Sequence, residues 1–437
     1  MKHAAVLSLV LDASMLAAQE EGGDRQRLPS PVTVDWTRAT VTRTTAPSVL
    51  VAADPEWTAE GKLSAVAIDG VRKLAAAGAD NIRLLNFNIF PEMSVAQMEE
   101  GVWNFTRMDQ VVLPFLDACG NASVLVDIES SPAWMWEPFS GPCPQRLAPC
   151  GTDTCADAER TDLPPSTGGG YGNRLRCPHW GDAEVPRDKT WKELATYFTR
   201  VSDWYTKGGF TLPDGTRHES GHRYKIAFWE IWNEVNNGRE HGMTKEDYLE
   251  YYDTQVLALQ SSPGGAVSKF GGPSLSGLSM QNVDDWMPFL LDRKNHKPET
   301  TPFDALTFHQ YCMCENRTGA GMEAAFEGVE NHLSALQRVQ HWRDTLRPEA
   351  TLHLTESGLI CNAPKGCGGN NYSCWHTEFD ELYWLASGSQ WLYQYLRSAE
   401  AADLATIAQS QILGYPHKYD GLSGKRKCPF LVCVRSF

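Results

Sequence analysis

The sequence is short of long apolar runs, of glycine-rich phosphate loops and of positive charge. In its 437 residues, no apolar run reaches the roughly 20 residues of a membrane-spanning helix, so we expect no membrane partner. Neither GxGxxG nor GxxxxGK occurs, which disfavours a nucleotide-binding open sheet. The formal net charge is -15, which argues against nucleic acid as the main partner.

The CxxC spacing of common zinc sites is also missing, although the chain has 12 cysteines. Apart from Cys119, they cluster in the second half of the chain and in one long loop: Cys143, Cys150, Cys155, Cys177, Cys312, Cys314, Cys361, Cys367, Cys374, Cys428 and Cys433. Disulfide bonds are therefore the favoured interpretation, with zinc ligation as the alternative. We expect no metal ion and no other cofactor.

Several features indicate export. Residues 1–18 have a basic start, an apolar middle and a small-residue end at Ala17 and Ala18, as in a secretory signal peptide. Asn-x-Ser/Thr triplets add modest support at Asn104, Asn121, Asn316 and Asn371. We therefore expect a disulfide-bonded glycoprotein that is secreted or resides in the secretory pathway or a lysosome-like compartment.

Strand-like and helix-like patterns alternate along most of the chain. Strands are expected at 32–36 or 48–52, 82–86, 123–128, 224–233, 274–279, 305–311, 351–355 and 404–413, and helices at 62–77, 191–205, 247–259, 323–346 and 382–399. This alternation predicts an α/β fold, a (β/α)8 TIM barrel over residues 30–415. An open doubly wound sheet is the alternative. We expect residues 137–190 to form a long loop insertion and residues 416–437 to form a C-terminal tail. The predicted disulfides would stabilise the long βα loops.

Two glutamates follow or end predicted strands. Glu234 comes after FWEIWN, and Glu356 lies in LHLTESG. In a parallel barrel the carboxyl ends of the strands share one face, so both acids should reach the same cavity. Such a pair suits glycoside hydrolysis, in which one carboxylic acid protonates the leaving oxygen and the other carboxylate attacks or activates water. Glu230 shares a strand face with Glu234, but its deeper position favours a paired structural acid. The 15 tryptophans and 14 tyrosines weakly favour a sugar ligand.

Together, FWEIWNEV, HQY and LTESG resemble a barrel clan of retaining glycosidases that use two glutamates, and within it the β-xylosidase/α-L-iduronidase family. The resemblance implies that Glu234 is the general acid/base and Glu356 the nucleophile. It also implies substrate-binding or supporting roles, and the residues concerned are Asn233, His309, Tyr311, Arg83, Trp134 and Trp136. Asn233 would bind a sugar 2-hydroxyl, Tyr311 would orient the nucleophile, and SSPAWMW would supply an aromatic wall.

The sequence thus predicts a retaining O-glycosyl hydrolase that acts on an oligosaccharide, polysaccharide or smaller glycoside. Two alternatives remain open: a non-catalytic carbohydrate-binding barrel, and a metal-dependent hydrolase that uses His309, His353 and nearby acids. The sugar, its anomer, exo or endo action, the disulfide pairing and the oligomeric state do not follow from the sequence.

Overall fold

The computed structural model describes residues 44–52, 65–85, 96–97, 99–129, 131–135, 186–236, 243–262, 268–314, 319–361 and 381–409. The predicted signal peptide, the tail from 416 and the predicted insertion up to residue 185 lie outside these residues. None of the helices in the described ranges is long and apolar enough to cross a membrane.

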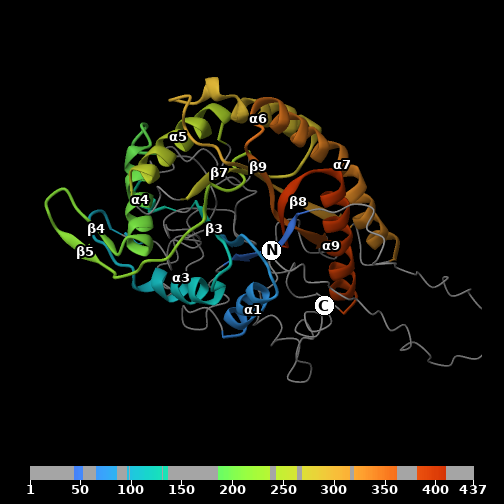
Figure 1. The fold of residues 1–437 in the computed structure, drawn as a ribbon, viewed down its shortest axis with the longest axis horizontal. Coiled ribbons are helices and arrows are strands. Elements are labelled where there is room, and N and C mark those ends of the chain that lie inside the picture. The colour runs from blue at the N-terminus through green and yellow to red at the C-terminus, as the bar shows by residue number, and fades with distance from the viewer. Residues whose placement is uncertain are drawn as a thin grey trace, which may run out of the picture. The chain divides into compact units, whose positions relative to one another are not determined.

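Eight parallel strands close into a barrel, as the sequence predicted (Figure 1). They are β1 (Ala46–Ala52), β2 (Ile82–Leu85), β3 (Val124–Ile128), β6 (Phe228–Ile231), β7 (Lys269–Leu275), β8 (Ala305–Cys314), β9 (Thr351–Cys361) and β10 (Leu404–Gln409). Each strand pairs with its neighbours in the sequence, and β1 pairs with β10 to close the ring. Of the two expected positions for the first strand, 48–52 lies within β1.

Helices follow the strands and surround the barrel in Figure 1. They are α1 (Ala65–Ala76), α3 (Thr106–Cys119), α4 (Lys192–Thr206), α5 (Lys245–Ser261), α6 (Met280–Leu291), α7 (Gly319–Leu346) and α9 (Glu381–Ala401). Local chemistry fixes several ends: the Thr244 hydroxyl accepts from Asp247 N at the start of α5, and Ser279 accepts from Asn282 N at the start of α6. Gly78, with φ 96°, follows the end of α1.

The fifth strand of the barrel differs from the prediction. We expected it at 274–279, but β7 begins at Lys269 and contains Gly271, Gly272 and Pro273. Both glycines are needed for close packing. A Cβ at Gly271 would lie 2.2 Å from Ala305 O, and one at Gly272 would lie 2.0 Å from the Tyr248 hydroxyl. Glycine normally weakens a strand pattern in a sequence. Here both glycines are required, because a larger side chain would collide with the neighbouring strand and helix.

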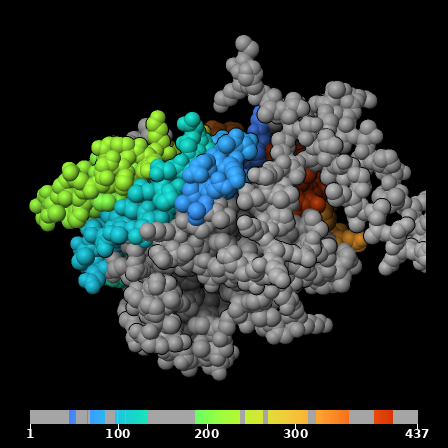
Figure 2. All heavy atoms as spheres, turned by 90° about the horizontal axis from the view of Figure 1, so that it is seen from below, coloured from blue at the N-terminus to red at the C-terminus, as the bar shows by residue number. Residues whose placement is uncertain are grey.

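A small antiparallel hairpin, β4 (Gly209–Thr211) and β5 (Arg217–Glu219), was not predicted. It extends from the end of α4, and its light-green atoms lie at one edge of the face shown in Figure 2. Phe210 packs against Trp103 with ring centroids 4.8 Å apart and stacks on His218 at 5.1 Å. The hairpin is thus anchored by an aromatic cluster outside the barrel.

Most of the apolar core lies between the strands and the helices, where one large cluster of buried residues joins nearly every element. Inside the barrel, the apolar cluster comprises Leu125, Phe228 and Ala305, from β3, β6 and β8. The ring of His353 stacks on Phe228 with centroids 5.5 Å apart. Above this small floor the interior becomes polar.

The described cysteines give a partial correction. Cys119 and Cys312 are buried free thiols, and burial raises the pKa of each to about 12. Cys312 had been grouped with the disulfide-forming cysteines, and a disulfide at this position is not shown, since its thiol is free. Its side chain points into a small apolar cluster with Ala325, Val329 and Leu359, where it packs as a hydrophobic group. The other predicted disulfide positions lie outside the described side chains.

Candidate active site

A fully buried arginine lies at the centre of the barrel interior. Arg83, on β2, donates from Nε to Glu230 Oε2 at 2.5 Å and from Nη1 to Glu356 Oε1 at 2.5 Å. Its Nη2 donates to Asn233 Oδ1 at 2.9 Å and to Asp127 Oδ2 at 3.2 Å. One guanidinium therefore organises groups from three other strands and from the segment after β6, which its planar set of donors makes possible.

The charges in this network stabilise one another. Burial alone would lower the pKa of Arg83, but the carboxylates of Glu230, Asp127 and Glu356 outweigh burial and raise it. Burial raises the pKa of Glu230, but Arg83, His309 and neighbouring hydroxyl groups together outweigh burial, so the pKa of Glu230 falls below its ordinary value. Glu230 is completely buried and is held as a paired carboxylate, as its depth in the barrel had suggested.

Glu356 lies within β9 and not at its end, because β9 continues to Cys361. Between β8 and β9 the register shifts, so that Phe308 is opposite Leu354 whereas His309 is opposite Glu356. Thr355 is the extra residue of this β-bulge, and bulges redirect side chains. As a result, two consecutive side chains reach the interior: Thr355 donates to Glu230 Oε1 at 3.1 Å, and Glu356 Oε2 accepts from the Tyr311 hydroxyl at 2.6 Å.

Glu234 lies in a strained turn after β6. Its φ is 46° and that of Trp232 is 68°, in the left-handed region that side chains other than glycine rarely adopt. Hydrogen bonds hold the turn: Trp232 N donates to Ile128 O at 3.1 Å, and Glu234 N donates to Ser274 O at 3.1 Å. Ser274 also has a positive φ, 53°, and its N donates to the Thr307 hydroxyl at 2.9 Å. Strain of this kind persists where the surroundings enforce it, which is common at functional sites.

His309 lies between the two predicted catalytic acids. Its Nδ1 is 2.8 Å from Glu234 Oε1, and its Nε2 is 3.6 Å from Glu356 Oε1. One donor atom from each of Glu234, His309 and Glu356 lies within 4.8 Å of the other two. The side chains of Glu234 and Glu356 are 12% and 9% exposed, so both acids are largely removed from water.

Of the eight predicted site residues, the structure brings six together: Glu234, Glu356, Asn233, His309, Tyr311 and Arg83. Trp136 lies outside the described residues. Trp134 belongs to a short 3-10 turn, η3 (Ala133–Met135), after β3. Its indole donates to Gln97 O at 3.0 Å, and the Arg187 guanidinium lies 5.0 Å from its ring centroid. One face of this ring is therefore already covered.

Three members of the site were not predicted: Asp127, Ser274 and Thr355. Asp127 did carry a signal, because an acid within the apolar strand Val124–Ile128 contrasts with the usual composition of a buried parallel strand. Ser274 and Thr355 carried none. They act through a positive φ and a bulge that arise from contacts between strands.

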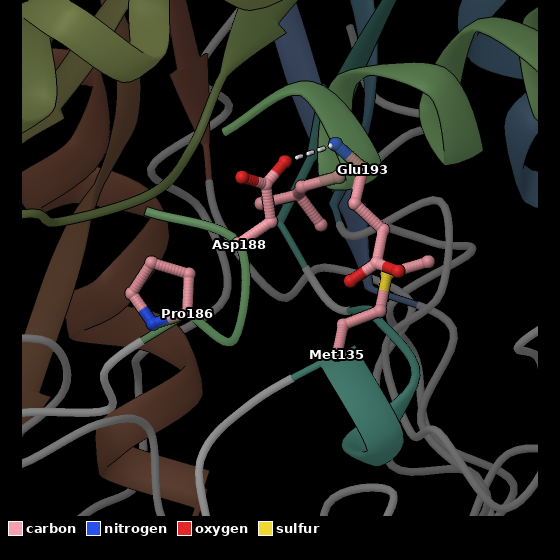
Figure 3. A pocket seen from close by; sticks show the side chains of 5 residues that line it. Met135, Pro186, Asp188 and Glu193 are labelled. Atoms are coloured by element: carbon pink, nitrogen blue, oxygen red, sulfur yellow. Dashed lines mark hydrogen bonds between the residues drawn. The ribbon is translucent and has the colours of Figure 1, made fainter. Parts of the chain in front are cut away.

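A small recess between the turn after β3 and the start of α4 is shown in Figure 3. It is lined by Met135, Pro186, Asp188, Glu193 and Leu194. Asp188 Oδ2 accepts from Glu193 N at 2.9 Å and Oδ1 from Thr190 N at 2.9 Å. These bonds, together with that of the Thr190 hydroxyl, lower the pKa of Asp188 despite its partial burial, so Asp188 serves as a cap for α4.

The residues do not support the two-histidine metal site considered from the sequence. His353 is paired with Thr307 in the β8–β9 register, whereas His309 is paired with Glu356, nearer the carboxyl end. Both ring nitrogens of His353 have hydroxyl partners, Thr351 at 2.8 Å and Thr406 at 3.0 Å. Burial lowers the pKa of His353 to about 4, so it is neutral and structural. His309, by contrast, could join Glu234 and Glu356 in holding a metal ion.

The letters HExxH, which mark one class of zinc hydrolases, occur once, from His218 to His222. That motif works on a helix, where residues four apart share one face. Here His218 lies on β5, and its ring stacks on Phe210, while His222 stacks on Tyr205 with centroids 5.9 Å apart. The pattern therefore lies on a strand and the segment that follows it, and is a chance match.

No family model matches the chain, and no curated protein matches it. Among solved structures, a glucosidase from Croceicoccus marinus is 12% identical with a TM-score of 0.49, and the match covers 84% of this chain and 60% of that one. An endo-β1,6-glucanase is 12% identical with a TM-score of 0.45, covering 84% of this chain and 65% of the other. A family 51 α-L-arabinofuranosidase from Bifidobacterium longum is 12% identical with a TM-score of 0.48, covering 85% and 68%. The chain spans less than two thirds of the first two proteins. Function is therefore inferred from the geometry of the site.

Proposed function

We propose that this protein is a retaining glycoside hydrolase with Glu356 as nucleophile and Glu234 as general acid/base. One observation carries the proposal: a carboxylate oxygen of Glu234 and one of Glu356 lie within 4.8 Å of each other. Retaining glycosidases hold their two carboxyl groups about 5–5.5 Å apart, whereas inverting ones need roughly 6.5–9.5 Å to admit a water molecule. The spacing supports double displacement.

In the first step Glu356 attacks the anomeric carbon while Glu234 gives a proton to the departing oxygen, and a covalent glycosyl-enzyme results. Hydrogen bonds from Arg83 and Tyr311 stabilise the charge of Glu356, and they fix both of its oxygens. In the second step Glu234 removes a proton from water, which releases the sugar from Glu356.

Asn233 would contact the sugar 2-hydroxyl. Its Oδ1 already accepts from Arg83, which leaves its amide NH2 group as the donor toward the substrate. Hydrogen bonds to the 2-hydroxyl strengthen as positive charge develops on the ring in the transition state. From the sequence resemblance, we propose a β-xyloside or α-L-iduronide as the substrate. A panel of aryl glycosides that includes both tests this choice directly.

The nucleophile is tested by Glu356→Ala. We expect hydrolysis of aryl glycosides to fall by about 10⁴-fold or more, because no covalent intermediate can form. Added azide should restore turnover of activated substrates and yield a glycosyl azide of inverted configuration, since it enters the space that the side chain vacated. Near-normal turnover in the variant would refute the role.

The acid/base is tested by Glu234→Gln. We expect losses of about 10²–10⁴-fold on substrates with poor leaving groups and much smaller losses in glycosylation with good ones, because good leaving groups need no proton. An equal loss on all leaving groups would contradict the assignment. Binding of sugars by the wild-type protein without hydrolysis of any of them would instead favour the carbohydrate-binding barrel.

A further inference from the structure

We propose that Glu234, His309 and Glu356 form a binding site for a zinc-class divalent cation, which excludes the substrate. Carboxylate oxygens and a neutral imidazole are the donors that zinc accepts in proteins. The three residues come from β8, β9 and the turn after β6, and their donor atoms already converge. The site would be inhibitory, because the proposed reaction uses both glutamates without a metal.

The histidine supplies the first independent argument. His309 is completely buried, and its Nε2 makes no hydrogen bond within the described part of the chain. The other ring nitrogen, Nδ1, is engaged by Glu234. A buried imidazole nitrogen without a hydrogen bond is a ready metal ligand. Glu234 would exchange its contact with Nδ1 for a bond to the ion.

The distances supply the second argument. Nε2 of His309 and Oε1 of Glu356 are 3.6 Å apart. If each bonded one ion at about 2.1 Å, the angle at the ion would be about 120°, close to tetrahedral. Two ligands of one ion can be at most about 4.2 Å apart at that bond length. A tetrahedral ion holds its ligands about 3.4 Å apart at that bond length, so Glu234 has to turn from Nδ1 toward the ion to complete the site.

The negative charge of the barrel interior supplies the third argument. In the described network, the carboxylates of Asp127, Glu230 and Glu356 surround one guanidinium, Arg83, and Glu234 adds a fourth carboxylate beside His309. The excess of negative charge favours a cation in the space between the two glutamates. A bound ion would lie where the anomeric carbon must enter, so the inhibition, unlike the binding, rests on the proposed hydrolase activity.

The test is calorimetric titration of Zn²⁺ into the metal-free full chain without a histidine tag. We expect one site in the wild-type protein, binding weakened by at least about tenfold in His309→Gln, and no comparable binding of Mg²⁺, which prefers six oxygen ligands. The double variant His218→Gln/His222→Gln is the matched control, because it removes two histidines in and just after the hairpin, and it should bind Zn²⁺ as the wild type does.

Absence of Zn²⁺ binding, unchanged binding in His309→Gln, or loss of binding in the hairpin variant would each overturn the site. If His309→Gln does not fold, as judged by circular dichroism, Glu234→Gln replaces it with the same expected weakening. Inhibition is then measured with an aryl glycoside and should be competitive. A protein that binds Zn²⁺ at this site but hydrolyses no glycoside would refute the proposed function and leave the metal site standing.

Discussion

The inside of the barrel and the layer around it use opposite chemistry. Between strands and helices, buried side chains are almost all apolar and form one continuous cluster. Within the barrel, an apolar floor of Leu125, Phe228 and Ala305 lies beneath a layer in which Arg83 joins three carboxylates. A barrel interior is more often filled by branched aliphatic residues. The comparison indicates that the outer layer supplies the stability, whereas the interior is organised for chemistry.

The largest effect should come from the centre of the interior. Arg83→Met leaves Glu230, Asp127 and Glu356 buried without their cation, which typically costs about 3–5 kcal/mol per broken pair, and hydrolysis should be lost with it. Urea denaturation measures the stability. Arg83→Lys keeps the positive charge but loses the planar set of donors. Its stability should therefore lie between that of the wild type and that of Arg83→Met. A loss below about 1 kcal/mol in Arg83→Met would show that the interior is not organised around this residue.

The free energy of unfolding should depend on pH through His353, whose ring stacks on Phe228 inside the barrel. The pKa of His353 is depressed from 6.5 to about 4 by burial, so the unfolded chain binds a proton more readily than the folded one. Its contribution to stability is therefore present above about pH 6.5 and is lost as the pH falls toward 4, by about 3 kcal/mol. Unfolding curves at several pH values should show a steeper loss for the wild type than for His353→Gln, and parallel pH profiles would contradict this account.

The outer layer should tolerate small changes. Ile407→Val, on β10, removes one methylene group from the large apolar cluster and should cost about 0.5–1.5 kcal/mol. Because Ile407 belongs to the apolar cluster around the barrel and not to the polar network, kcat measured per folded molecule should stay unchanged. A fall in kcat without a comparable fall in stability would show that the two regions are more tightly coupled than the structure indicates.

The smallest effect is expected at the surface. Arg397 on α9 pairs with Glu330 on α7 at 2.7 Å at the surface of the protein, where water screens the attraction. Arg397→Ala should leave the midpoint of urea denaturation unchanged within the error of the measurement. A clear shift would mean that the surface pair stabilises the packing of α9 on α7. The difference in stabilisation between buried and exposed ion pairs would then be smaller than we expect.

How far the fold followed from the sequence depended on how regular each element was. The strands of β8, β9 and β10 carry apolar patterns, and the eight-stranded closed barrel is confirmed. Helices α3 and α6 were not identified, and each contains an internal proline, Pro114 and Pro288. Proline normally argues against a helix interior, and here tertiary packing overrides that preference.

The candidate site could be predicted from the sequence less completely than the fold. The sequence placed Glu234 and Glu356 on one face of the barrel, and one carboxylate oxygen of each lies within 4.8 Å of the other. Their catalytic roles remain a proposal. The sequence placed Glu356 at the end of a strand, but it belongs to the middle of β9 and reaches the interior because of the bulge at Thr355. Register shifts of this kind depend on the neighbouring strand and leave no trace in one sequence.

The amino-acid sequence by itself determined the alternation of strands and helices, and with it the order of strands around the barrel. Short-range periodicity and the short connections between neighbours suffice for that. Only the tertiary structure decided that Arg83 would bind three carboxylates, that His309 would lie between the two glutamates, and that Ser274 would hold Glu234. These contacts join residues far apart in the chain, and their geometry depends on register, bulges and left-handed turns that form only when the strands meet.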